Sequence, residues 1–163
     1  VYASDVNGDG ITELPRAVLM AGYKDTSSSD AVYMLDWYAY GIGKVPAKVA
    51  TTYQNISDAW SLLIDQKWHD RITAIKANDG GLSYVEFFEY RKNKMSIPLF
   101  NIYCATGSNR EYYAERTDLI QLGQTTQAIY FAKLTNEGEQ SELALTGDEI
   151  KARFSLVNQA WNN

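Results

Sequence analysis

Apolar residues in this chain fall in short stretches separated by polar or glycine-rich turns, a pattern that predicts a series of strands. The aromatic-rich stretch 33–40 is typical of a strand, and the glycines within 41–44 would turn the chain back into a second strand at 45–53. Asn78-Asp79-Gly80-Gly81 indicates a hairpin turn later in the chain. Further strands are predicted at 59–64, 71–77, 82–90, 97–105, 118–123 and 127–135.

Two capping boxes predict where helices begin. The first starts at Ser108 and has Glu111 three residues later; the second starts at Thr146 and has Glu149 in the same place. Apolar side chains after the second box are spaced by four, three and four residues, which predicts one face of an amphipathic helix. They are Ile150, Phe154, Val157 and Trp161. Polar loops are expected at 24–30 and 136–141.

This order of elements resembles that of PsbP-like domains over residues 56–162. The stretches that carry the resemblance are 60–64, Trp68, 72–75, 99–103, 129–132 and the C-terminal helix ending in Trp161. The resemblance implies an α+β fold, in which helices pack on an antiparallel β-sheet. It also implies a binding or assembly role, since these domains share no set of catalytic residues. We expect an acidic segment at 1–23 and an α+β domain at 24–163, together forming one compact unit.

The acidic segment contains the most specific motif of the chain. Side-chain oxygens recur on alternate residues at Asp5, Asn7 and Asp9, and Gly10 and then Glu13 follow. Calcium takes six to eight oxygen ligands, and a tight turn after the fifth loop position lets a backbone carbonyl join them. The same residues are also compatible with a metal-free turn whose side chains cap their own backbone.

The loop departs from an EF-hand, because position 12 is Arg16 rather than glutamate and Pro15 would disrupt the exit helix. Over residues 2–15 it resembles instead the calcium loop of FG-GAP and VCBS repeats. That resemblance implies ligands from Asp5, Asn7, Asp9, the carbonyl of Ile11, and Glu13. The expected cofactor is therefore a structural Ca²⁺ ion.

Charge and composition exclude some classes of function. The chain of 163 residues has a formal net charge of −5, which argues against general nucleic-acid binding. It has no run of apolar residues long enough to span a membrane as a helix. Cys104 is the single cysteine, so an internal disulfide is impossible, and we expect its side chain to be buried.

Candidate catalytic groups are sparse. Asp36, Trp37 and Tyr38 form a possible ligand patch, which would suit a sugar. Glu86 and Glu89 are three apart on a predicted strand, so they should point to opposite faces, and we expect solvated or edge positions for both. His69 is the single histidine, which excludes a multi-histidine zinc site.

These observations predict a non-enzymatic calcium-binding domain of a secreted or cell-surface bacterial protein, serving as an interaction or structural module. Its partner would be another protein or a component of the cell envelope. The alternative is a carbohydrate-active enzyme or a sugar-binding module. Because the chain begins at Val1, we expect it to be part of a longer protein, with a lipid anchor upstream as one way of holding it at the surface.

Overall fold

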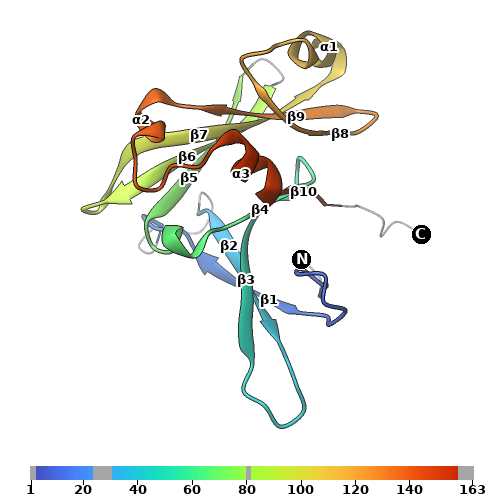
Figure 1. The fold of residues 1–163 in the computed structure, drawn as a ribbon, viewed down its shortest axis with the longest axis vertical. Helices are drawn as coiled ribbons and strands as arrows, with labels where there is room; N and C mark the ends of the chain where they lie inside the picture. Colours follow the sequence, from blue (N-terminus) through green and yellow to red (C-terminus); the bar gives the residue numbers. More distant parts are fainter. Residues whose placement is uncertain (1–2, 24–30, 80–81, 158–163) are drawn as a thin grey trace.

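The computed structural model describes residues 3–23, 31–79 and 82–157, which form two five-stranded antiparallel sheets (Figure 1). The strand order of the first sheet is β1-β2-β3-β4-β10. Its strands are β1 (Leu14–Leu19), β2 (Tyr33–Ala39), β3 (Ala47–Asn55), β4 (Trp60–Leu63) and β10 (Phe154–Leu156). The strand order of the second sheet is β5-β6-β7-β9-β8. Its strands are β5 (Ile72–Asp79), β6 (Leu82–Arg91), β7 (Lys94–Thr106), β8 (Ile120–Gln124) and β9 (Ala128–Leu134).

The chain completes most of one sheet before it starts the other. Strands β1 to β4 pair with their sequence neighbours, and so do β5 to β7. Strand β9 then pairs with β7, and β8 lies outside β9 at the edge. The last strand, β10, returns to the first sheet beside β4, so the two ends of the described chain belong to the same sheet.

The prediction of an α+β fold with helices packed on one sheet was wrong, because the main partner of each sheet is the other sheet. Between them lies one large cluster of buried side chains drawn from both sheets. Tyr53 of the first sheet meets Phe87 of the second edge to face, with ring centroids 5.4 Å apart. Phe87 in turn stacks on Phe100 at 4.8 Å, and Trp68 packs against Phe100 at 5.7 Å.

The helices in the described residues are short. They are α1 (Arg110–Ala114), α2 (Asn136–Glu139) and α3 (Gly147–Arg153), with 3-10 turns at Gln66–Trp68 and Gly107–Asn109. Helix α1 covers part of the outer face of the second sheet, where Tyr113 stacks on Phe131. None of the helices among these residues has the length and apolar content needed to cross a membrane.

The amphipathic helix predicted through Trp161 stops at Arg153. Its capping box forms as predicted, with Thr146 accepting from the Glu149 amide and the Glu149 carboxylate accepting from the Thr146 amide. At Phe154, however, the backbone becomes extended and pairs with Leu62. A seven-residue helix is marginal by itself, whereas the free edge of β4 offers hydrogen bonds to an extended chain. Trp161 lies outside the described residues.

The other local predictions had mixed outcomes. The predicted strands are present with shifted ends, and the 71–77 and 82–90 strands pair as an antiparallel hairpin, although Gly80 and Gly81 lie outside the described residues. The loop at 24–30 also lies outside them. The Ser108 capping box was wrong, because a 3-10 turn with Thr106 at its N-cap precedes α1. The expected loop at 136–141 contains α2.

Phe154 provides a direct test of the strand that replaces the predicted helix. Its ring stacks on Trp60 of the first sheet at 5.9 Å and packs on Tyr130 of the second at 5.6 Å. We expect Phe154→Ala to lower the free energy of unfolding by about 3 kcal/mol or more, because it leaves a cavity between the sheets. Leu156→Ala on the same strand is the control and should cost less than about 1 kcal/mol. Urea unfolding measures both, and equal losses would contradict this packing.

Candidate metal centre

The acidic loop is a closed hook that leads directly into β1. Ser4 and Glu13 form an antiparallel bridge with two backbone hydrogen bonds of 3.1 and 2.9 Å, which join the two ends of the loop. Gly8 and Gly10 have φ angles of +76° and +84°, a region that side-chain-bearing residues rarely adopt. The glycines of the motif are therefore needed for the path of the backbone.

Loop side chains turn inward and accept hydrogen bonds from loop amides. Asp5 Oδ1 accepts from the amides of Gly8 and Asp9, and its Oδ2 accepts from the amide of Gly10 at 2.9 Å. Asp9 Oδ1 accepts from the amide of Ile11 at 2.8 Å. These are the Asx-type contacts that the metal-free interpretation requires, but carboxylate oxygens also hold metal ions while they accept such bonds.

Three carboxylates converge inside the hook. One oxygen from each of Asp5, Asp9 and Glu13 lies within 4.8 Å of the others. Asn7 is joined to this group through its side-chain amide, which donates to Asp9 Oδ2 at 3.0 Å. The fifth predicted ligand residue, Ile11, is tied to Asp9 by its amide, while its side chain is half exposed.

Glu13 is the distinctive member of this group because it is 0% exposed. Its Oε2 accepts from the amide of Val6 at 2.9 Å. Its Oε1 is buried and has no hydrogen-bond partner among the described atoms. A buried carboxylate oxygen without a partner is costly, and two further carboxylates close by increase that cost. The donor set therefore fits a hard cation, which prefers oxygen ligands and would supply the missing partner.

The possible ligand patch at Asp36, Trp37 and Tyr38 is not gathered on one surface. Neighbouring residues of β2 point to opposite faces, so Trp37 lies on the other side from Asp36 and Tyr38. Trp37 is only 2% exposed, and its indole N–H donates to Thr52. Asp36 is also buried and accepts from the hydroxyl of Thr51 at 2.6 Å. These contacts give Asp36 and Trp37 structural roles within the first sheet.

Cys104 and His69 are not brought together. His69 lines an open hollow of about 530 Å³ beside β3, whereas Cys104 lines a separate hollow of about 400 Å³. Cys104 is buried, as predicted. Burial, assisted by the nearby Asp58, raises the pKa of the Cys104 thiol to about 11, so it is protonated at neutral pH. A protonated thiol is a poor nucleophile.

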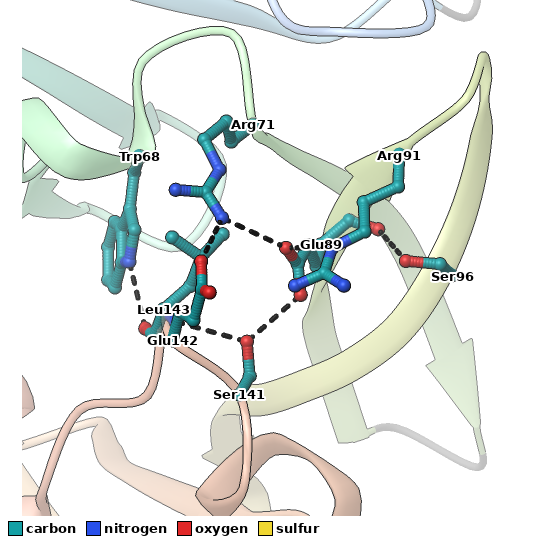
Figure 2. A network of polar contacts seen from close by, with 8 residues as sticks. All are labelled: Trp68, Arg71, Glu89, Arg91, Ser96, Ser141, Glu142 and Leu143. Carbon is teal, nitrogen blue, oxygen red and sulfur yellow. Dashed lines mark hydrogen bonds and ion pairs between the residues drawn. The ribbon is translucent and has the colours of Figure 1, made fainter.

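The prediction of a solvated or edge position was wrong for Glu89, whose side chain is fully buried. Figure 2 shows its carboxylate between Arg91, which donates from Nε, Arg71 at 3.4 Å and Ser141 at 2.9 Å. A signal was available, because Glu89 lies two residues after Phe87 on the core-facing side of β6.

The network around Glu89 fastens the second sheet to the segment that precedes α3. Arg71 also binds Glu142 at 2.9 Å, and next to it Trp68 donates its indole N–H to the carbonyl of Leu143 (Figure 2). Burial by itself would raise the Glu89 pKa, but hydrogen bonds from Arg91 and Ser141 outweigh it, and the pKa lies below its ordinary 4.5. Its partners are thus sufficient to keep this carboxylate charged, and its role is structural.

Comparison of the chain with protein-family models, characterised proteins and solved structures found no match. The resemblance of the loop to FG-GAP and VCBS repeats therefore stays a prediction from its spacing.

The Glu89 network makes stability depend on pH in a defined direction. Because the folded-state pKa is lowered, its contribution is present above pH 4.5 and is lost as the pH falls through the folded value. At neutral pH we expect Glu89→Gln to cost about 1–3 kcal/mol, and the difference from the wild type should shrink in acid. Urea unfolding across a pH series measures it, with Glu86→Gln on the opposite face as the control. A difference that is constant with pH would contradict this account.

Proposed function

We propose that residues 5–13 bind one calcium ion and that this ion has a structural role. The supporting observation is the buried Oε1 of Glu13, which has no partner and lies in a group with Asp5 and Asp9. A cation within this group would offset the repulsion between three carboxylates and satisfy the unpartnered oxygen.

The chemistry of the donors favours calcium over other metals. All side-chain candidates offer oxygen: the carboxylates of Asp5, Asp9 and Glu13, and the amide oxygen of Asn7, whose NH2 group donates to Asp9. Zinc and copper prefer nitrogen and sulfur ligands, and magnesium demands a stricter octahedral geometry than a loop of this length usually supplies. The carbonyl of Ile11 would complete the ligand set that the spacing predicts.

The ion would connect the N-terminal segment to the sheet. Glu13 is both a proposed ligand and the residue immediately before β1, and its backbone pairs with Ser4. Strand β1 is at the edge of the first sheet and pairs with β2. Holding Glu13 in place would therefore fix the path of residues 3–13 and limit fraying of the edge strand.

The broader function that we propose is a non-enzymatic module of a secreted or cell-surface bacterial protein, which binds a protein or another component of the cell envelope. Extracellular modules of this kind work with weak calcium sites, of about 10⁻⁴–10⁻³ M affinity, because extracellular calcium is abundant. The pairing of Trp37 with Thr52, the burial of Asp36 and the separation of His69 from Cys104 support this role over an enzymatic one.

Calcium should raise the melting temperature of the chain, because it binds the folded loop and not the unfolded one. At a free calcium concentration of about 100 times the dissociation constant, the gain is about 2.7 kcal/mol, or roughly 5–10 °C for a domain of this size. Scanning calorimetry with calcium and with a chelator measures the shift. Identical transitions in the two conditions would refute the proposed site.

Glu13→Gln separates metal binding from ordinary packing at the same position. In calcium the variant should lose most of the stabilisation by the metal. In chelator it should be at least as stable as the wild type, since it removes one of three neighbouring carboxylates. Glu115→Gln changes an exposed carboxylate elsewhere and should keep the full calcium response. Equal loss of stability by Glu13→Gln with and without calcium would assign Glu13 a purely structural role.

A further inference from the structure

The hairpin between β2 and β3 projects beyond the rest of the molecule, at the bottom of the view in Figure 1. The last paired residues of its strands are Ala39 and Ala47, so residues 40–46 form an unpaired tip, here called the hairpin tip. Gly43 has a φ of +70°, which allows the chain to reverse there. Strand β1 does not reach the tip, because its first residue, Leu14, pairs with Tyr38, two residues before the tip begins. Among residues 3–23, 31–79 and 82–157, no strand pairs with the hairpin tip.

Apolar side chains at this tip are largely exposed within the described part of the chain. Ile42 is 106% exposed, Val45 is 88% exposed and Tyr40 is 56% exposed. Turns are usually polar, because exposed apolar groups gain nothing from folding. Val49 and Leu14, near the base of the same hairpin, are also exposed. Burial within the described fold does not account for these residue types, which makes the tip a candidate contact surface.

The charge of this region differs from that of the whole chain. Residues 40–49 contain Lys44 and Lys48 and no acidic side chain, although the chain as a whole has a net charge of −5. Lys48 is 3.4 Å from the buried Asp36, which leaves Lys44 as the main positive group of the tip. The tip therefore carries one basic side chain, Lys44, between the exposed apolar residues Ile42 and Val45.

We propose that the hairpin tip inserts into the interface of an anionic lipid bilayer. A stable protein interface buries about 800 Å² on each partner, whereas three side chains on one narrow turn offer on the order of a few hundred Å². A bilayer needs no complementary shape, because its acyl region accepts Ile42 and Val45 wherever the tip enters. Lys44 would meet anionic headgroups, and Tyr40 would lie at the depth that amphipathic aromatic side chains prefer. The inference concerns peripheral attachment and does not depend on the proposed calcium site.

Vesicle flotation tests the proposal with the whole chain. The wild type should float with vesicles of phosphatidylcholine and phosphatidylserine, and less with phosphatidylcholine alone. Ile42→Asp combined with Val45→Asp should reduce binding at least about tenfold, because two apolar side chains no longer enter the bilayer. Lys44→Glu should reduce binding to the anionic vesicles by roughly an order of magnitude. Neither change removes a buried contact, so the fold should persist, which circular dichroism verifies.

Met95→Asp is the matched control, because Met95 is a half-exposed apolar residue beside a different hairpin turn, between β6 and β7. It should bind vesicles as the wild type does. An Ile42→Trp variant gives a second readout, since Trp37, Trp60 and Trp68 are buried and the wild type supplies the background. Its fluorescence should shift to shorter wavelength when anionic vesicles are added.

Several results would overturn the proposal. One is that the wild type floats with neither kind of vesicle. Another is that the double aspartate variant floats as well as the wild type. A third is that chelator abolishes wild-type flotation, which would mean that calcium bridges the protein and the lipid. Sedimentation velocity adds another. If the wild type forms dimers that the double variant cannot form, and neither binds vesicles, the tip is a contact between two copies of the chain.

Discussion

The structure depends on the burial of aromatic rings between two sheets, because each sheet buries its apolar face against the other. Tyr53, Phe87 and Phe100 form a continuous series of ring contacts from the first sheet into the second. Each ring removes a large apolar surface from water, and their geometry adds a smaller specific attraction. Helices and loops complete the same core, because Trp68, Leu143 and Ile150 are fully buried in it.

Two polar groups are buried in different ways, and the difference separates a structural role from a proposed binding role. Glu89 is surrounded by Arg71, Arg91 and Ser141, so its charge is compensated within the chain. Glu13 is buried to the same degree, yet one of its oxygens has no partner and the charged groups gathered with it are acidic. The first arrangement is complete, whereas the second leaves a buried oxygen that the proposed cation would satisfy.

The proposed calcium loop and the hairpin tip lie toward the same end of the first sheet. Glu13 precedes β1, and Leu14 at the start of β1 pairs with Tyr38, two residues before the hairpin tip begins. Calcium at the loop and contact with lipid at the tip would place both proposed activities at one end of the molecule. The second sheet, with its buried Glu89 network, would then serve as the support that holds this end in place.

Local patterns in the sequence were sufficient for eight of the ten strands, all except β1 and β10, and for the capping box at Thr146, because each depends on residues close together in the chain. They were insufficient where distant segments compete for the same residues. The spacing of Ile150 and Phe154 suits a helix, but only the folded chain presents the free edge of β4 that makes Phe154 extended. Likewise, the sequence contains Glu89 and Glu13, whereas tertiary packing decides that one receives partners and the other keeps an unpaired oxygen, since burial and pairing are set by segments far apart in sequence.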